Sequence, residues 1–477
     1  MWPFGSRNRP PRKALTAVPA RRAAAKYDAA QTTADNRRHW ANADGLSATA
    51  AGSVAVRKTL RNRARYEVAN NSYAAGIMAT LANDVVGTGP RLQMGTASND
   101  INRIRETLFA SWAKAVGLAE KLRTMRLARA QDGEAFMLLT TNPDLRHSIK
   151  LFPVVIEADQ IASPNLMQNL LQLSGDIVDG ITFDSNGEPK TYTMLDKHPG
   201  AAAALISRTF TEIPAASMIH WFKKGRPGQR RGISELTPAL PLFAQLRRYT
   251  LAVIGAAEAV ADIAVVMKTT MPSGEEAAEV EPMTEIEYAA RMATFMPEGW
   301  EPFQIKAEQP STTYADFKKE ILNEIARCIP MPYNVAVGNS AGYNYASGRL
   351  DKQAYYKFIR VDQSSAEAVV LDPLLRAFAE EASKVYAFID KQYAWPHQWF
   401  WDGTEHVDPV KEAVAQSKRL ESNTTTLATE YARNGKDWET ELEQIARERK
   451  RMKALGLVPA DVEPAEAGTG RSGDGQS

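Results

Sequence analysis

The chain has 477 residues, which suggests two to four structural units or one large composite fold. Hydrophobic residues make up 44% and charged residues 24%, a composition that excludes a wholly disordered or fibrous protein. The formal net charge is only +2, so the charge of the whole chain does not indicate nucleic-acid binding. The single cysteine, Cys328, excludes an internal disulfide framework and favours a reducing compartment.

The charge is unevenly distributed at the start of the chain. Residues 1–65 contain 14 Lys or Arg against three Asp, a balance of +11. Residues 1–25 lack hydrophobic periodicity and are predicted to form a flexible basic tail. This tail is either a solvated segment or an arm that contacts nucleic acid or a partner.

No signal peptide or membrane segment is expected. The most apolar stretch, residues 251–267, contains Glu258 and Asp262 and is too short and too charged to span a bilayer. The sequence therefore predicts a soluble, intracellular protein.

Residues 54–131 show the hydrophobic periodicity of helices, and residues 134–222 show that of strands. An apolar stripe on Val56, Leu60, Ala64 and Val68 predicts an inward helix face, and a stripe on residues 101, 104, 108 and 112 predicts another. Helices are expected over residues 54–69, 73–86, 101–115 and 122–131. Short apolar runs then predict five strands, over residues 134–140, 149–157, 177–183, 190–195 and 217–222. The fold class is α+β.

A helix, an acidic insertion and a second helix form the next pattern. The first helix, apolar on nearly all faces, is predicted to reach about Lys268, and such a helix must be covered on most sides. Residues 269–312 hold nine Glu against two cations, a balance of −7. The second helix is predicted over residues 314–329. A polar loop rich in Asn, Gly and Tyr is expected over residues 333–348.

The last third of the chain is predicted to be mainly helical. Residues 346–389 form a long helical stretch with a kink at Pro373, and a charge-mixed helical segment runs from 407 to about 457. The final residues, 461–477, are expected to be disordered.

The sequence motifs that could indicate catalysis do not support an active site. The basic glycine loop at residues 225–232 lacks the Gly-Lys-Ser/Thr ending of a phosphate-binding P-loop. Cys328 is more consistent with a core thiol than with a nucleophile, and Asp132-Gly133-Glu134 with a turn than with a carboxylate pair. No catalytic residue, metal ligand or cofactor is therefore predicted.

Several runs, in order and with plausible spacing over about residues 25–455, resemble the lambda-type portal proteins of tailed bacteriophages. They are Tyr27-Asp28-Ala29-Ala30, Arg65-Tyr66-Glu67-Val68-Ala69-Asn70-Asn71-Ser72-Tyr73-Ala74, Asn83-Asp84-Val85-Val86-Gly87-Thr88-Gly89-Pro90, Asp132-Gly133-Glu134-Ala135-Phe136, Ile156-Glu157-Ala158-Asp159-Gln160-Ile161, Gly232-Ile233-Ser234-Glu235-Leu236 and Asp408-Pro409-Val410-Lys411-Glu412-Ala413.

This resemblance implies the domain plan of a portal subunit. The implied parts are a wing (26–235), a stem of two helices (236–268 and 313–330), a clip (269–312), a channel loop (331–348), a long helix that returns to the wing (349–405) and a crown (406–460).

The resemblance also implies a function without catalysis. It implies a ring, in this family usually of twelve subunits, at one vertex of the capsid in the virion, assembled in the host cytoplasm. The ring would conduct double-stranded DNA without sequence preference. The terminase large subunit would dock on the clip and head-tail joining proteins would later replace it, while major capsid and scaffolding proteins would surround the ring. No membrane is implied.

Three sets of residues carry these expectations. The first is the DNA-channel loop, with Gly338, Asn339, Ser340, Gly342, Tyr343 and Asn344. The second is the partner-docking surface of the clip, with Glu275, Glu276 and Glu279. The third is the subunit interface on the first stem helix, with Leu251, Ile254, Ala257 and Val260.

Two alternatives remain open from the sequence. One is a metal-dependent DNA-processing enzyme, such as a nuclease that uses Asp132, Glu134 and Asp159 with Mg²⁺. The other is a different virion structural protein, such as a capsid or tail-tube subunit.

Overall fold

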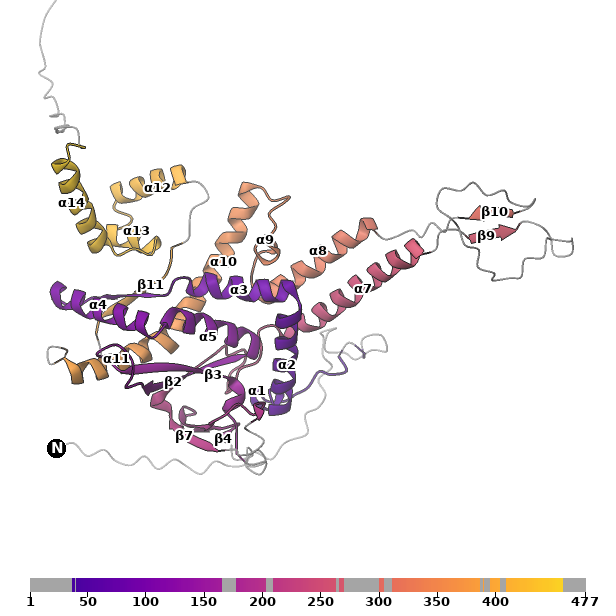
Figure 1. The fold of residues 1–477 in the computed structure, drawn as a ribbon, viewed down its shortest axis with the longest axis horizontal. Coiled ribbons are helices and arrows are strands. Elements are labelled where there is room, and N and C mark those ends of the chain that lie inside the picture. Colours follow the sequence, from indigo (N-terminus) through magenta and orange to yellow (C-terminus); the bar gives the residue numbers. More distant parts are fainter. Residues whose placement is uncertain are drawn as a thin grey trace, which may run out of the picture.

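The structure, a computed structural model, describes residues 37–38, 40–164, 177–202, 209–262, 266–269, 300–303, 311–386, 389, 395–403 and 409–457. The predicted N-terminal and C-terminal tails, 1–25 and 461–477, lie outside these residues. The α+β prediction is confirmed, because the described residues form a mainly helical body with one three-stranded sheet, one four-stranded sheet and two two-stranded ribbons, all antiparallel (Figure 1). Within the described residues, no helix is long and apolar enough to cross a membrane.

Five helices open the described chain: α1 (Ala48–Ala51), α2 (Val54–Asn70), α3 (Ser72–Val86), α4 (Asn99–Ala115) and α5 (Leu118–Asp132). The break between α2 and α3 falls at the predicted Asn-Asn-Ser run, where the Asn71 side chain accepts hydrogen bonds from the first backbone N–H groups of α3. α3 and α5 pack closely along the centre of the body. The sequence therefore located α2 to α5 to within a few residues, whereas α1 was not predicted.

The buried faces of α2 and α4 differ from the predicted apolar stripes. Val56 is exposed, and the buried residues of α2 are Arg57, Arg61, Ala64 and Glu67. On α4, Ile101 and Ile104 are exposed, while Asn102, Arg105, Phe109 and Trp112 are buried. The predicted stripes hold in part, because Ala64 and Trp112 are buried and Leu60, Val68 and Leu108 pack against the core. The buried arginines were not predicted, because charged side chains were assumed to face water, whereas Arg57 and Arg61 have buried carboxylate partners.

Two small sheets lie below the helices in Figure 1. The three-stranded sheet has the order β3-β2-β8, formed by Leu151–Ile156, Glu134–Thr141 and Met218–Phe222. The four-stranded sheet has the order β4-β5-β6-β7, formed by Ile177–Val178, Ile181–Phe183, Pro189–Leu195 and Phe210–Pro214. The predicted run 177–183 is split into two strands by a turn at Asp179-Gly180, and β7 was not predicted.

The main core is aromatic where α4 meets the helix Asp372–Val385, labelled α11. The rings of Phe109, Trp112 and Phe378 lie 5.1–5.5 Å apart, and Trp399 completes the cluster. Trp399 lies on β11 (His397–Phe400), which pairs antiparallel with β1 (Arg91–Met94). This ribbon joins segments about 300 residues apart, so a reading of local patterns could not predict it.

The first helix of the helix–insertion–helix pattern is shorter than predicted. α7 (Leu240–Asp262) ends six residues before Lys268, and Val266–Thr269 forms strand β9, which pairs with β10 (Trp300–Phe303). An apolar run without periodicity does not distinguish helix from strand, and the pairing with β10 decides the outcome here. α8 (Ser311–Cys328) returns beside α7, and both helices project from the body with the β9–β10 pair at their far end (Figure 1).

The predicted polar loop contains a short helix. α9 (Tyr333–Val337) ends at Gly338, which adopts the left-handed φ of +66° that favours glycine, so the exposed connection covers only residues 338–344. Asn344 begins α10 (Tyr345–Ala366) through a capping box with Ser347. Glu367–Leu371 then forms a wide π turn before α11 (Asp372–Val385), where the predicted kink at Pro373 lies. The indole N–H groups of Trp401 and Trp399 donate hydrogen bonds to Glu367 and Asp372 at the two ends of this turn.

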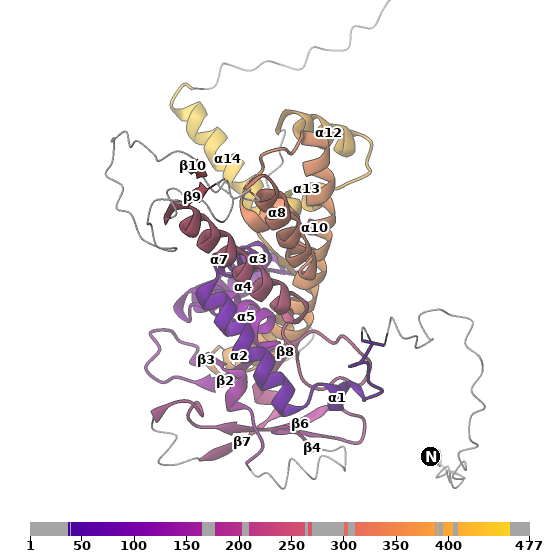
Figure 2. The ribbon, with the colours of Figure 1, turned by 90° about the vertical axis from the view of Figure 1, so that its right-hand side faces the viewer.

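The C-terminal region has three helices: α12 (Pro409–Glu421), α13 (Leu427–Arg433) and α14 (Trp438–Ala454). Among the described side chains of residues 409–457, no apolar one is buried; Glu430 is buried instead, held by Arg419 and Arg433. The three helices lie at the end of the body opposite the stem, on the side away from the four-stranded sheet (Figures 1 and 2).

Candidate functional site: assembly surfaces and buried charge junctions

The base of the α7–α8 pair is part of the core, whereas its outer half is uncovered. Phe243 and Leu246 of α7 are buried against the body. Further along, the side chain of Leu251 is 63% exposed and that of Ile254 is 48% exposed, and on α8 that of Phe317 is 46% exposed. Ala257 is half-buried, and the side chain of Val260 lies outside the described residues. Large apolar side chains in such a projecting pair have the exposure expected of an interface.

The six loop residues predicted to face DNA lie together at one end of α10. Gly338, Asn339, Ser340, Gly342 and Asn344 are exposed, while Tyr343 is half-buried. The connection contains no charged residue between Gly338 and Asn344. The three clip glutamates, Glu275, Glu276 and Glu279, lie outside the described residues.

A buried ionic junction lies where α5 ends and β2 begins. The Glu134 carboxylate, fully buried, accepts hydrogen bonds from the Arg231 guanidinium at 2.7–3.1 Å and from the His220 ring at 3.1 Å. Arg61 of α2 adds a third contact at 3.3 Å. Burial alone would raise the pKa of the Glu134 carboxyl, but the charge of Arg231 and the hydrogen bonds from His220 and Arg231 hold that pKa well below its usual range.

Two segments that carry the family resemblance meet at this junction. Gly133 ends α5 with φ +93°, and a Cβ atom there would lie 2.5 Å from the backbone carbon of Ile233. The Gly232 N–H donates to Glu134, and the Glu235 N–H donates to the Ala130 carbonyl. Asp132-Gly133-Glu134 thus joins the root of the stem to the sheet.

The carboxylates of the nuclease alternative are occupied by arginines. Asp132 forms a two-pronged ion pair with Arg65 at 2.7–2.8 Å, and Asp159 contacts Arg61 and Arg65 at 2.8 Å. Burial raises the pKa of Asp159, but the two guanidinium groups lower it by more. Among the described residues, Glu157, Asp159 and His198 could present metal ligands within 4.8 Å of one another, yet both carboxylates are already paired with arginines. The arrangement has the chemistry of a structural clamp.

A second junction connects α5, the root of the stem and α10. Arg126 contacts Asp362 at 2.5 Å and Glu235 at 3.1 Å, and Arg129 contacts the same two carboxylates. All four side chains are buried. The Cys328 thiol at the end of α8 donates to the Glu235 carbonyl, and its burial raises its pKa to about 11, so it is a packed thiol as predicted. Both stem helices are therefore fixed to the helix that follows the loop.

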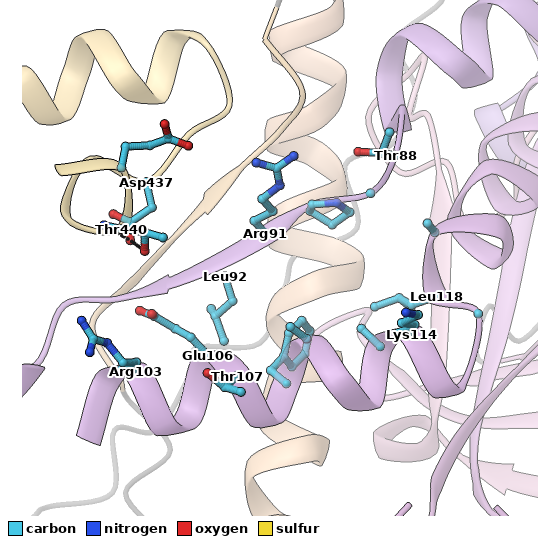
Figure 3. A pocket seen from close by; sticks show the side chains of 18 of the residues that line it. Thr88, Arg91, Leu92, Arg103, Glu106, Thr107, Lys114, Leu118, Asp437 and Thr440 are labelled. Atoms are coloured by element: carbon cyan, nitrogen blue, oxygen red, sulfur yellow. Dashed lines mark hydrogen bonds between the residues drawn. The ribbon is translucent and has the colours of Figure 1, made fainter. Parts of the chain in front are cut away.

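A cleft of about 920 Å³ separates α4 and β1 from α14. Figure 3 shows Arg91 pointing from β1 away from α4, whereas Glu106 lies on α4, on the other side of that strand, and Asp437 lies at the start of α14. Arg91 donates to the Gly435 carbonyl and Gln93 to Asp437, both at 2.6 Å, so the C-terminal helices are attached through polar contacts. Burial raises the pKa of Glu106, an effect partly opposed by the hydrogen bond from the Met94 N–H.

Comparison with known proteins agrees with the resemblance seen in the sequence. A family model described as "Phage portal protein, lambda family" matches residues 35–363. The "Probable portal protein" of Halomonas phage phiHAP-1 (isolate -/Gulf of Mexico/-/2001) is 26% identical over 431 residues, which is 84% of this chain and 82% of the relative.

Solved structures also show a distant likeness. A chain of the "Neck of empty GTA particle computed with C6 symmetry" has a TM-score of 0.44 and 13% identity over 78% of this chain and 92% of that chain. A chain of the "Neck of native GTA particle computed with C12 symmetry" has a TM-score of 0.43 and 12% identity over 80% of this chain and 94% of that chain. Likeness at this level carries no conclusion about assembly.

The Glu134 junction predicts a large effect from an isosteric change. Glu134→Gln removes the negative charge that Arg231 and Arg61 share, and it leaves buried cations undercompensated. We expect a loss of about 3–5 kcal/mol in the free energy of unfolding, measured by urea denaturation. Glu157→Gln, at an exposed carboxylate nearby, serves as the control and should change it by less than about 1 kcal/mol. An unchanged stability in Glu134→Gln would contradict the structural role.

His220 predicts a pH dependence of stability. Burial lowers the pKa of the His220 ring in the folded state, despite the opposing effect of Glu134. Because the unfolded chain then binds the extra proton first, stability should fall as the pH drops below about 6.5, by about 1.4 kcal/mol per pH unit until the folded pKa is reached. His220→Gln keeps a donor for Glu134 but cannot titrate, so its unfolding curve should lose this component. An identical pH profile for both proteins would contradict the assignment.

Proposed function

Because the chain belongs to the lambda family of phage portal proteins, we propose that its copies assemble into a ring, with twelve subunits as in other portals, at one vertex of the phage head. The ring conducts double-stranded DNA during packaging and ejection. It acts without catalysis, and the packaging ATPase is a separate terminase.

The main support for a ring is the exposure of apolar side chains on the two stem helices, α7 and α8. A helix pair that leaves the body with Leu251, Ile254 and Phe317 exposed buries these side chains when a neighbouring stem lies beside it. At about 25 cal/mol per Å² of apolar surface, each such contact contributes to a favourable association. Leu251, Ile254, Ala257 and Val260 form the proposed interface.

The loop at residues 338–344 fits the channel. A channel must pass DNA of any sequence, so strong phosphate binding would resist sliding, and an uncharged loop avoids it. The loop shares a side of the molecule with α12, opposite the four-stranded sheet, which places the wing outward when this side faces the axis (Figure 2).

The far end of the stem is the proposed docking site for partners. The acidic segment between β9 and β10, which includes Glu275, Glu276 and Glu279, would attract a basic surface of the terminase large subunit, and later of head-tail joining proteins. Major capsid and scaffolding proteins would contact the wing. The assembled ring belongs to the virion, after assembly in the host cytoplasm.

The proposed interface predicts that Ala257→Asp prevents ring formation. The change places an unpaired charge between stems, which costs several kcal/mol at each contact and is repeated around the ring. Light scattering after size exclusion should show subunits or small oligomers in place of rings. Ala55→Asp, at an exposed position of α2, is the control and should leave assembly intact. Normal rings of Ala257→Asp would remove this face from the interface.

The proposed channel predicts that lysines in the loop slow the passage of DNA. Asn339→Lys with Ser340→Lys adds two cations per subunit beside the duplex, so packaging into purified proheads should slow, most strongly at low salt. Ser185→Lys with Asn186→Lys adds the same charge in the β5–β6 turn, on the opposite side of the molecule, and should have no effect. Packaging at the normal rate at both salt concentrations would exclude the loop from the channel.

A further inference from the structure

The second half of α14 is strongly basic. Its residues from 447 to 453 include five cations and one carboxylate, Glu448. All five cationic side chains are exposed: Arg447, Arg449, Lys450, Arg451 and Lys453. We call these five residues the α14 tip.

The α14 tip has no ionic partners among the residues that the structure describes. The ion pairs near this helix use its acidic first half, where Glu443 contacts Arg103 and Glu441 contacts Lys436 at 3.2 Å. The cations of the tip lie on two faces of the helix, because positions 447 and 451 lie on one face while 449 and 453 lie on another, and Glu448 and Met452 occupy the remaining face. Five exposed cations within two turns of helix suit a polyanion better than a single carboxylate.

Helix capping does not account for all of this charge. Cations stabilise the C-terminal end of a helix through its dipole, but the effect falls off within the last turn. That explanation covers Arg451 and Lys453, whereas Arg447 lies two turns before the end of the helix at Ala454. The positive charge therefore exceeds what the helix itself needs.

The position of the α14 tip in the fold indicates which polyanion it would bind. α14 lies at the end of the body opposite the stem, on the same side as the start of α10 and the loop at residues 338–344 (Figures 1 and 2). A duplex that passes this loop along the long axis of the subunit would next meet α14. The uncharged loop and the cationic tip would thus contact the same DNA at successive positions.

We propose that the α14 tip binds the phosphate backbone of double-stranded DNA, without sequence preference, at the inner mouth of the portal. This inference rests on the proposed function, since it takes the loop side as the side that faces DNA. Binding at the mouth holds the DNA after packaging, while the loop lets it slide.

The test compares four forms of the full-length protein, the wild type and three variants, in their binding to a 60-base-pair duplex of random sequence, by fluorescence anisotropy between 50 and 200 mM NaCl. One variant changes all five residues of the tip to Gln, which keeps good helix propensity. The control variant changes five exposed lysines of the wing and its neighbouring loop to Gln: Lys58, Lys190, Lys197, Lys223 and Lys224.

The logarithm of the affinity falls with the logarithm of the salt concentration in proportion to the number of phosphates neutralised. The tip variant should bind more weakly at 50 mM NaCl, and its slope should be shallower by about 0.9 for each lost contact. The control variant should keep the wild-type slope. Arg447→Lys with Arg449→Lys and Arg451→Lys retains the charge and should also keep it.

Three results would overturn the inference: a tip variant with wild-type affinity and slope, equal losses in the tip and control variants, or tip-dependent binding to vesicles with 30% phosphatidylserine but not to DNA. Light scattering on the same samples separates the two proposals. If the protein forms rings and the tip variant binds DNA as the wild type does, this inference is wrong but the ring proposal stands. If the protein forms no rings but the tip variant loses DNA binding, the ring proposal is wrong but this inference stands.

Discussion

The part of the body formed by α2, β2 and β8 depends on the pairing of the buried Glu134 carboxylate. A carboxylate removed from water destabilises the fold unless cations and hydrogen-bond donors surround it, and here Arg231, His220 and Arg61 supply them. These partners come from the loop before the stem, from β8 and from α2, so a single charge aligns three segments. The adjacent Arg126–Asp362 junction extends the same arrangement to α10. The body is thus organised by matched charges as much as by its aromatic core.

The sequence predicted the order of the fold well where the signals are local. The break at Asn71 and the helix–insertion–helix pattern both depend on neighbouring residues, and both are present. The β1–β11 ribbon was missed because its two strands are joined only by tertiary contact, and the end of α7 was misplaced for the same reason.

The candidate sites were predictable only in part. The stem residues Leu251 and Ile254 were chosen because an apolar helix needs cover, and their exposure agrees with that reasoning. The arginines of α2 were overlooked, since polar residues are normally assigned to the surface. One signal was available: Arg57, Arg61 and Arg65 recur at intervals of four and form a single stripe. Their carboxylate partners are 67 to 122 residues away, so the pairing itself required the fold.

The lack of buried apolar side chains in α12–α14 has a consequence for local stability. Hydrogen-exchange protection reflects the free energy of local opening, and a region without a core opens at little cost. In a free subunit, these helices would lose protection long before α3 or α5, whose side chains fill the centre of the body. The helices α12 to α14 would therefore open as a separate cooperative unit, which can rearrange without unfolding the helices at the centre of the body.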